Sequence, residues 1–292
     1  MYYKTSGYRI FTVINYTLLL LAGLLCVLPI IHILAISFSA SAPANAHLVG
    51  LWPVDFNIES YTKTLNNPNF IRAFFISIGR TILGTFMTMS VITLAAYALS
   101  KDASVFKGRN IYSWYFVFTM LFTGGMIPIY IVVRNLHLMD TIWALVLPGA
   151  VQVYNMILMI NFFKATPKEL EEAALIDGAG HFIILFRVFL PLAMPSIATL
   201  SLFSIVGNWN AWFDGLLYIN NYRNYPLATF LQTIIVQQDF SKLNPDVNEL
   251  KNISQRTVKA AQIFIGILPV LMVYPFLQRF FVKGIVLGAV KE

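Results

Sequence analysis

The run FTVINYTLLLLAGLLCVLPIIHILAISF, residues 11–38, decides the fold of this chain. It contains no Asp, Glu, Lys or Arg, and its only cysteine and histidine are Cys26 and His32. About 20 apolar residues suffice for a helix to cross the hydrocarbon core of a bilayer. The run is also too long for the apolar core of a signal peptide, so we expect it to remain in the mature protein as a membrane span.

Composition places the rest of the chain in the same class. Hydrophobic residues make up 58% of the sequence and charged residues 11%, whereas soluble domains carry roughly 25% charged residues. The sequence therefore predicts an all-α polytopic membrane protein. We attribute the net charge of +7 to anchoring at lipid headgroups. No basic stripe is interleaved with aromatic residues, so nucleic acid is not an expected partner.

Hydropathy divides residues 1–292, which we take as a single transmembrane domain, into six predicted helical spans. An even number places both termini on one side. With the N-terminus inside, the inner segments hold eleven Lys and Arg residues and the outer loops eight, which favours cytoplasmic termini. The predicted spans are 11–38, 73–99, 111–133, 142–163, 195–218 and 260–280; the outer loops are 39–72, with a short helix near 58–65, and 219–259; the inner loop is 164–194 and the tail 281–292.

The inner loop contains a charged helix, TPKELEEAALIDGA at residues 166–179. Thr166 and Glu169 have the spacing of a capping box, and Pro167 stands where the first helical residue lacks an N–H partner in any case. Gly178 tolerates the positive φ that ends a helix. The pattern predicts a self-capped helix between two spans.

One face of this helix is too small to build a core. Leu170, Ala173, Ala174 and Asp177 follow an i, i+3, i+4, i+7 spacing and share that face. Such a face suits a groove on another protein. The alternative is a helix lying on lipid headgroups, but interfacial helices favour basic polar faces with bulky apolar anchors, and this helix is acidic and small.

Several chemistries are set aside by elimination. The chain has no Gly-Lys dipeptide and hence no phosphate-binding loop of the Walker type. It has no Cys/His spacing for zinc and no clustered acid–base set. We therefore expect no ATPase site, no other enzyme activity, and no cofactor or metal bound by this chain. His32 is the one histidine inside a predicted span, and intramembrane ionisable groups are candidates for function.

At this point the residues carry a resemblance. Glu172-Ala173-Ala174, followed by Gly178 and Leu190-Pro191, resembles the EAA signature of permease subunits in bacterial ABC importers. Asp177-Gly178-Ala179 is similar to the sugar-importer branch, the relatives of the smaller maltose-transporter permease. Further stretches, at 124–128, 207–210 and 281–291, resemble permeases for complex or acidic oligosaccharides, those for alginate oligosaccharides in particular.

The resemblance implies a type I ABC importer permease in the cytoplasmic membrane of a bacterium, working by alternating access. Its coupling helix docks on an ATPase subunit, and the tail with Gly284, Gly288 and Lys291 inserts between the two ATPase subunits. That tail suits an extended strand; the alternative is a frayed chain end. The coupling residues carried over are Leu170, Glu172, Ala173, Ala174, Asp177 and Gly178. The implied partners are a second homologous permease, two ATP-binding cassette subunits that hold ATP and Mg, a soluble solute-binding protein, the oligosaccharide and membrane lipid.

The substrate path is expected where amides and aromatic rings meet inside the spans. Amides hydrogen-bond sugar hydroxyls and aromatic faces stack on sugar C–H surfaces. The equal alternative is Trp in an interfacial belt and Asn bridging helices. Asp214 lies near the outer end of the fifth predicted span. Arg80 in the second span pairs with an inner acid or faces an anionic substrate, and the sequence leaves both open. The candidate path residues are Tyr154, Asn155, Asn208, Trp209, Asn210 and Trp212.

Two other transport classes stay open. An ion-coupled secondary transporter carries charged pairs and matching broken helices in two halves, whereas these spans are almost free of Asp and Glu and show no half-repeat. Permeases for amino acids or peptides share the EAA core with sugar permeases. The sugar assignment therefore depends on the resemblance outside that core.

Overall fold

The computed structural model describes residues 5–241 and 255–288. Within this part of the chain every regular element is helical and no strand is present. The residues divide into two compact units, one comprising the chain up to 71 together with 233–268, the other comprising 72–232 together with the chain from 269. Each unit is described by itself below.

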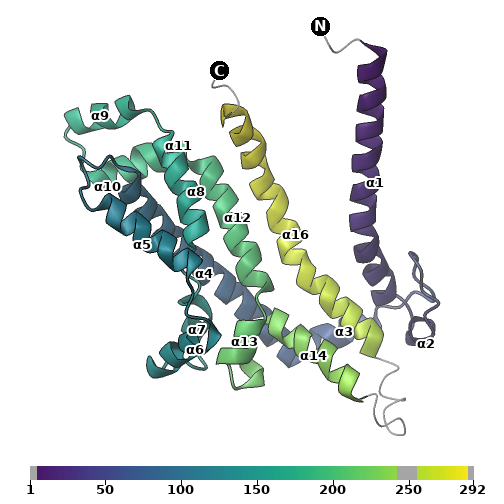
Figure 1. Cartoon of the computed structure of the whole chain (residues 1–292). Helices are drawn as coiled ribbons and strands as arrows, with labels where there is room; N and C mark the ends of the chain where they lie inside the picture. Colours follow the sequence, from purple (N-terminus) through teal and green to yellow (C-terminus); the bar gives the residue numbers. More distant parts are fainter. Residues whose placement is uncertain (1–4, 242–254, 289–292) are drawn as a thin grey trace. The chain divides into compact units, whose positions relative to one another are not determined.

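The helices follow one another closely along the chain (Figure 1). They are α1 (Ser6–Ser37), α2 (Ser41–Asn45), α3 (Glu59–Leu65), α4 (Pro68–Ser100), α5 (Arg109–Leu121), α6 (Met126–Asn135), α7 (Ile142–Val146), α8 (Val153–Lys164), α9 (Lys168–Ile176), α10 (His181–Ile184), a π-helical turn (Leu185–Phe189), α11 (Leu190–Leu192), α12 (Met194–Asn210), α13 (Phe213–Tyr218), a 3₁₀ turn (Tyr222–Asn224), α14 (Leu227–Ser241) and α16 (Gln255–Gly288).

Three predicted spans are single helices. In the described residues, α1, α4 and the Arg256–Arg279 part of α16 are each long and apolar enough to cross a membrane. They coincide with the predicted spans at 11–38, 73–99 and 260–280. The protein is thus an all-α polytopic membrane protein, as its composition indicates.

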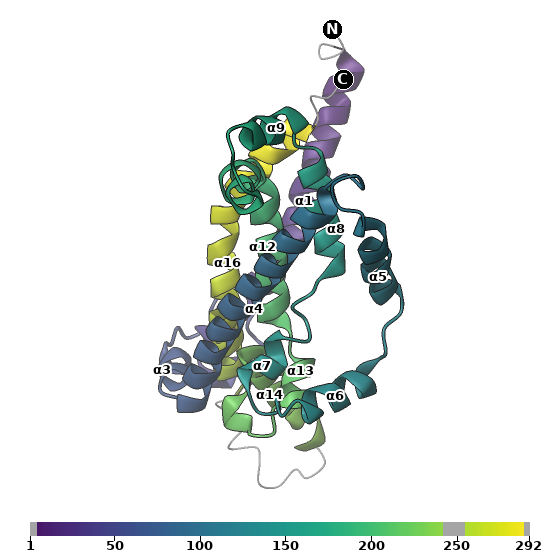
Figure 2. The same cartoon turned by 90° about the vertical axis from the view of Figure 1, so that its left-hand side faces the viewer.

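The other three predicted spans are broken, which corrects the expectation of continuous helices. α5 and α6 meet at 112° within the predicted span 111–133; Figure 2 shows the α5–α6 bend as an open arc. A second bend, of 83° between the α10–α11 stretch and α12, lies in the predicted inner loop just before the span 195–218. Gly125 has φ of +83° at the first bend, a conformation closed to helical residues. Pro148 and Gly149 lie between α7 and α8. The predicted span 195–218 is interrupted after Asn210, where α12 ends.

The second unit has its core where α4, α8, α10–α11 and α12 meet. Aromatic and aliphatic side chains from all of these elements interlock there, with the Phe163 and Phe189 rings 5.5 Å apart in edge-to-face geometry. α9 lies across one end of these helices, and α6, α7 and α13 lie at the opposite end (Figures 1 and 2). The buried members include Ile92, Ala96, Met156, Met159, Phe163, Ile184, Leu185, Phe189, Ala193 and Leu200.

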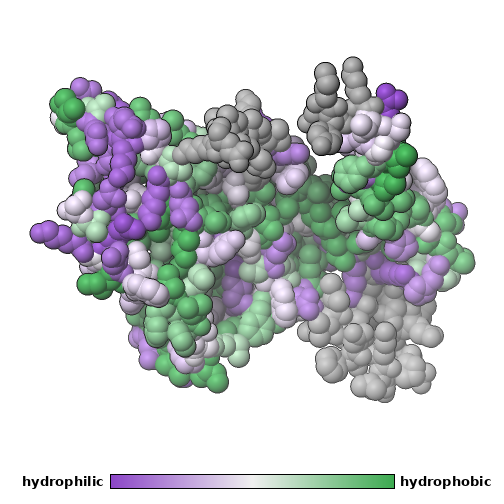
Figure 3. Space-filling model, turned by 45° about the horizontal axis from the view of Figure 1, so that its top comes forward, coloured by the Kyte–Doolittle hydropathy of each residue, from purple (hydrophilic) through white to green (hydrophobic). Residues whose placement is uncertain are grey.

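Hydrophilic side chains gather over the end of the molecule at which α9 lies (Figure 3). Most of the α9 sequence is charged or small, including the run from Lys168 to Glu172. The long helices below it present mainly hydrophobic side chains, as lipid-facing surfaces require. This polarity separates a water-facing end from the membrane-crossing part.

The first unit packs the end of α1 against the segment that follows it. Phe38 stacks on Tyr61 with ring centroids 4.7 Å apart, and α3 occupies the position of the predicted short helix at 58–65. The ring nitrogen Nδ1 of His32 lies 2.8 Å from the Gly50 carbonyl oxygen, a structural contact. In the described part of the predicted outer loop 219–259, residues Leu227–Ser241 form α14.

Candidate functional site

α9 begins differently from the capping pattern in its sequence but ends where that pattern predicts. Pro167 is the N-cap residue and no side chain caps the helix, so the predicted Thr166–Glu169 box does not form. The reason is that Thr166 closes the preceding helix, its N–H donating to the Phe163 carbonyl at 3.2 Å. The stop at Gly178 is confirmed, with φ of +78°.

The end of α9 has the hydrogen bonds of a Schellman motif. The Gly178 N–H donates to the Leu175 carbonyl at 3.0 Å, and the Ala179 N–H donates to the Ala174 carbonyl at 2.9 Å. Nothing stands within 4 Å of the position that a Cβ on Gly178 would take. The positive φ, not lack of space, is therefore what requires glycine at this position.

The predicted small face of α9 is divided between two directions. Ala174 is half-buried and packs against the core of its own unit. Ala173 and Glu172 are exposed, and Ile176 is 86% exposed. The helix therefore contributes one alanine to its own packing and offers the other, with acidic and apolar neighbours, to an outside partner. The exposed coupling candidates are Leu170, Glu172, Ala173, Asp177 and Gly178.

A buried lysine holds α9 from behind. Lys101, only 8% exposed, follows the last residue of α4, and its Nζ lies 2.5 Å from Oε1 of Glu171. The same ammonium sits 3.9 Å from the ring centroid of Tyr97 and 4.3 Å from that of Phe189. Burial lowers the pKa of Lys101, against the opposing effect of its bond to Glu171. The two rings and the carboxylate together stabilise this cation away from water.

Asp102, the residue after Lys101, forms a second ion pair with α9, in which the acid comes from the α4 side and the lysine from α9. Lys168 Nζ lies 2.6 Å from Oδ2 of Asp102, and both side chains are exposed. The hydrogen bond lowers the pKa of Asp102 and raises that of Lys168. Lys101, Asp102, Lys168 and Glu171 form what we call the α9 anchor: neighbours of opposite charge at the end of α4 pair with residues of opposite charge one turn apart on α9.

A cleft of about 500 Å³ opens beside the α9 anchor. Charged side chains of both signs line it, including Arg109, whose Nε has no partner among the described residues. Such a surface is suited to polar contacts with another protein. The lining residues are Ser100, Lys101, Asp102, Val105, Arg109, Phe163, Lys164, Thr166, Lys168, Glu171, Glu172, Leu175 and Phe189.

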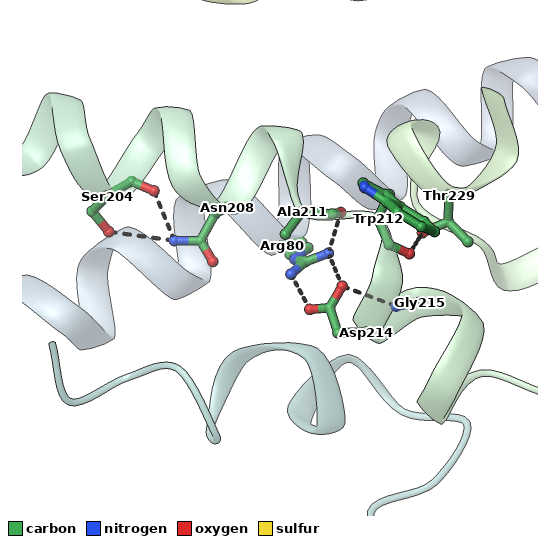
Figure 4. Close-up of polar contacts among 8 residues, drawn as sticks. All are labelled: Arg80, Ser204, Asn208, Ala211, Trp212, Asp214, Gly215 and Thr229. Carbon is green, nitrogen blue, oxygen red and sulfur yellow. Dashed lines mark hydrogen bonds and ion pairs between the residues drawn. The ribbon is translucent and has the colours of Figure 1, made fainter. Parts of the chain in front are cut away.

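The second polar site lies at the break between α12 and α13. The chain is extended at Ala211, and α13 begins at Phe213, so the backbone carbonyls there lose their helical partners. Arg80 of α4 donates from Nη1 to the Ala211 carbonyl at 3.0 Å. Its two Nη atoms also bind the two carboxylate oxygens of Asp214 (Figure 4). A cation at the end of α12 is favoured by the helix dipole as well.

Thr229 of α14 satisfies a second backbone carbonyl freed at the break between α12 and α13. Thr229 donates its hydroxyl to the Trp212 carbonyl at 2.8 Å, and the Gly215 N–H donates to Asp214 Oδ1 at 2.9 Å. A Cβ on Gly215 would lie 2.1 Å from the Thr229 hydroxyl oxygen, so only glycine fits. Broken helices persist in membranes where neighbouring groups satisfy the freed backbone. We call Arg80, Ala211, Trp212, Asp214 and Thr229 the α13 junction.

Arg80 is therefore occupied by protein groups. The residue is 2% exposed and pairs with Asp214, near the outer end of the fifth predicted span, and not with the inner acid that the sequence suggested. Its Nε has no partner among the described residues. The guanidinium is a structural link between α4 and α13 and does not present a free charge to an anionic substrate.

Two predicted path residues of α12, Asn208 and Trp209, make packing contacts. Asn208 donates from Nδ2 to the Ser204 carbonyl at 2.9 Å, and its Oδ1 would lie 2.5 Å from a Cβ on Gly84 of α4. Trp209 is buried and meets the Phe74 ring edge to face at 5.8 Å. Asn208 thus bonds within α12 and packs closely against Gly84 of α4.

Trp209 also lines a cavity of about 510 Å³. This cavity is bounded by α4, α12 and the part of α16 at 269–273, and its walls are mostly aliphatic. The Thr81 and Thr85 hydroxyls in its wall have no partner among the described residues. So apolar a cavity does not match the hydroxyl-rich surface of a sugar.

The remaining path candidates lie apart from that cavity. Trp212 is partly exposed and packs edge to face on Phe213 at 5.6 Å, and Asn210 is exposed. In α8, Asn155 is buried and donates to the Gln152 side chain, whereas Tyr154 is 62% exposed. The structure does not gather the six residues into one pocket in this conformation of the described chain.

Sequence reasoning missed the anchoring residues. Lys101 and Glu171 are separated by 70 residues, and neither belongs to the recognised signature. Asp140 was missed too: it accepts hydrogen bonds from the Asn220 N–H at 2.6 Å and Nδ2 at 2.8 Å, which lower its pKa. The one usable signal was the Lys101-Asp102 dipeptide, a charge pair directly after an apolar run.

The tail differs from its predicted extended form. α16 continues through Gly288, so the backbone at Gly284 and Gly288 is helical. The residues of α16 after Pro275 include no proline, so every one of them can donate its backbone N–H to a helical hydrogen bond. Lys291 lies outside the described residues.

The chain is similar to known transport proteins. Residues 103–286 match the family model described as "Binding-protein-dependent transport system inner membrane component". The chain is 39% identical over 289 residues to Protein LplC of Bacillus subtilis (strain 168), an alignment that covers 99% of this chain and 97% of LplC. It is 38% identical over 286 residues to the polygalacturonan/rhamnogalacturonan transport system permease protein YtcP of the same organism, covering 97% of this chain and 99% of YtcP.

A solved structure has the same fold. It is described as a bacterial ABC transporter involved in the import of the acidic polysaccharide alginate. The superposition has a TM-score of 0.84 at 33% sequence identity and covers 95% of this chain and 98% of the other.

Proposed function

Because this chain belongs to the family of inner membrane components of binding-protein-dependent transport systems, we propose that it is the permease subunit of an ATP-driven importer for acidic oligosaccharides. Members of this family are the membrane components of transport systems and are not themselves ATPases. Energy then comes from ATP and Mg bound by separate cassette subunits, and substrate comes from a solute-binding protein.

The observation that carries this function is α9. Among the described residues it is a short helix lying across the water-facing end of the long helices, fixed from behind by Lys101 and exposed in front. The exposed side combines Glu172 and Ala173 with Ile176. Apolar side chains that stand exposed within a polar rim are typical of protein docking sites. We assign this surface, with Leu170, Asp177 and Gly178, to contact with an ATPase subunit, while Ala174 holds α9 against its own unit.

The substrate class is supported by the relatives. One relative is a permease protein of a polygalacturonan/rhamnogalacturonan transport system, and the similar solved structure is of a transporter involved in alginate import. These polysaccharides contain sugar units that carry carboxylates. In this chain Arg80 is engaged by Asp214, so it does not supply the charge for carboxylate recognition. The second permease and the binding protein then provide most of that recognition, while Asn210, Trp212 and Tyr154 offer exposed polar and aromatic surface.

The proposed arrangement places α9 and both termini on the cytoplasmic side. The tail from residue 281 then lies near the ATPase subunits, and α1, whose apolar window is 11% buried, faces lipid or the second permease. Removal of residues 285–292 is expected to weaken retention of the ATPase subunits during purification. Unchanged retention would remove the tail from the interface.

Uptake by reconstituted vesicles tests the function. The complete importer, with both permeases, the cassette subunits and the binding protein, is placed in proteoliposomes and offered labelled oligouronates or neutral oligosaccharides of equal length. We expect uptake of the oligouronates that requires ATP. Uptake driven by an ion gradient without ATP would overturn the proposal, and a preference for the neutral sugars would overturn the substrate class.

Gly178 tests the role of α9. Gly178→Val forces a β-branched residue into positive φ, and we expect it to distort the end of α9 and to uncouple ATP hydrolysis from uptake. Gly178→Asn is the matched control, because asparagine tolerates this conformation. Measured uptake per ATP hydrolysed should fall in the valine variant alone. Normal uptake by that variant at normal expression would contradict the docking role.

A further inference from the structure

α4 is held by charged contacts at two distant points. At one, Lys101 and Asp102 bind α9; at the other, Arg80 binds the α12–α13 break. Between Arg80 and Lys101 the helix rises about 30 Å, the thickness of a bilayer core. All of these contacts lie within one compact unit.

The helix between these points is continuous. α4 runs without interruption from Pro68 to Ser100, and its only proline is the first residue. The three spans of this unit with which it shares a core, by contrast, are bent or interrupted. An unbroken helix transmits displacement along its axis, whereas a bend absorbs it.

More than one polar contact holds α4 at each of these two points. At the α9 anchor, the pairs Lys101–Glu171 and Asp102–Lys168 fix two points one turn apart on α9, so α9 can neither slide nor rotate without breaking one of them. At the α13 junction, the Arg80 fork binds both oxygens of Asp214 and the Ala211 carbonyl. A bidentate guanidinium fixes orientation as well as distance.

We propose that α4 between Arg80 and Lys101 is a strut that makes α9 and α13 move as one body, with Lys101, Glu171, Arg80 and Asp214 as its positioning residues. The proposal rests on the proposed docking of α9 on an ATPase subunit. A push on α9 from the ATPase side is delivered by the strut to the break at α13, at the opposite end of the unit. The bent helices rearrange around the strut.

Distance measurement tests the strut directly. In a Cys26→Ser background, Ile176→Cys on α9 and Leu216→Cys on α13 carry spin labels; both side chains are exposed. The complete, assembled importer is measured with and without ATP under non-hydrolysing conditions, after the labelled complex is shown to retain the ATPase subunits. We expect the distance between the labels to stay constant. A clear change on ATP binding would overturn the proposal without any further variant.

Removing the buried tie sharpens the test. Lys101→Met/Glu171→Gln removes both charges together and leaves no unpaired charge. We expect the ATPase subunits to co-purify, uptake per ATP to fall about fivefold or more, and the label distance to become sensitive to ATP. Lys101→Arg, which keeps a cation for the rings and for Glu171, should restore coupling, and Lys107→Met serves as a control in the same exposed loop.

The outcomes separate the two proposals. Uptake by the unaltered importer that does not depend on ATP refutes the proposed function. ATP-dependent uptake together with unchanged uptake per ATP in Lys101→Met/Glu171→Gln refutes the strut alone. A fall in uptake per ATP in the double variant, with normal uptake per ATP in Lys101→Arg, supports the strut. A merely structural role would lower the yield of protein without changing uptake per ATP.

Discussion

α4 makes charged contacts at two points, through Arg80 within the helix and through Lys101 and Asp102 just after it, and the chemistry of the two contacts differs. At the α13 junction one arginine fork meets a carboxylate and a freed backbone carbonyl inside the helical bundle. At the α9 anchor the work is divided between a buried lysine held by aromatic rings and an exposed ion pair in water. Arginine suits a site that demands fixed geometry and permanent charge, whereas lysine adapts to a boundary between protein core and water.

The difference predicts unequal costs when each contact is removed. A buried charge left without its partner is strongly destabilising, and an exposed pair contributes little. Removing a contact of the α13 junction should therefore cost the most stability, and removing the exposed Asp102–Lys168 pair of the α9 anchor the least. The following three changes are ordered by expected effect.

The largest effect is expected for Arg80→Met. The change leaves the Asp214 carboxylate and the Ala211 carbonyl without their donor, and breaking such a pair costs about 3 kcal/mol. Thermal unfolding of the purified importer should show a marked loss of stability. Arg80→Met/Asp214→Leu removes both charges and should recover part of it. Equal stability of the single variant and the unaltered protein would mean that the pair is not structural.

A smaller effect is expected for Gly215→Ala. The new methyl group would stand 2.1 Å from the Thr229 hydroxyl oxygen and force α13 away from it, an overpacking change worth about 2 kcal/mol. Gly207→Ala is the matched control, because nothing lies within 4 Å of the added atom. Both variants are compared by thermal unfolding. If Gly207→Ala proves as harmful as Gly215→Ala, the close contact at Thr229 is not the cause.

The smallest effect is expected at the exposed pair of the anchor. Asp102→Asn or Lys168→Gln should leave thermal stability almost unchanged, because water and salt screen this contact. The pKa of Asp102 is lowered from its usual 3.8 in the folded protein. Its contribution is therefore present above that value and lost as the pH falls through the lowered pKa. A stability change in Asp102→Asn that persists in high salt would show the pair to be more than a surface contact.

Local signals in the sequence predicted local features well. Gly178 was expected to end a helix, and it does so at positive φ, because only the backbone geometry of that residue matters. The short helix near 58–65 and the long spans at 11–38 and 73–99 follow from apolar patterning in the same way. By contrast, the Thr166–Glu169 capping box looked equally clear and does not form, since the N-cap residue of α9 is Pro167 and the Thr166 N–H donates back to Phe163 of α8.

The breaks in the other spans were harder to foresee. Hydropathy averages over a window, so residues 195–218 score as one apolar span even though α12 ends at Asn210. The break is stable only because Arg80 and Thr229, from other helices, satisfy the Ala211 and Trp212 carbonyls. No property of the span itself contains that information.

The sequence by itself determined that this protein is a helical membrane permease, through long apolar runs and an EAA-type signature that read along one stretch of chain. It also located α9 and its glycine stop. Only the tertiary structure decided which charges meet: Arg80 and Asp214 are 134 residues apart, and Lys101 and Glu171 are 70 apart. The physical reason is that hydropathy and capping act between neighbours in sequence, whereas a pairing of charges depends on which helices pack together in space.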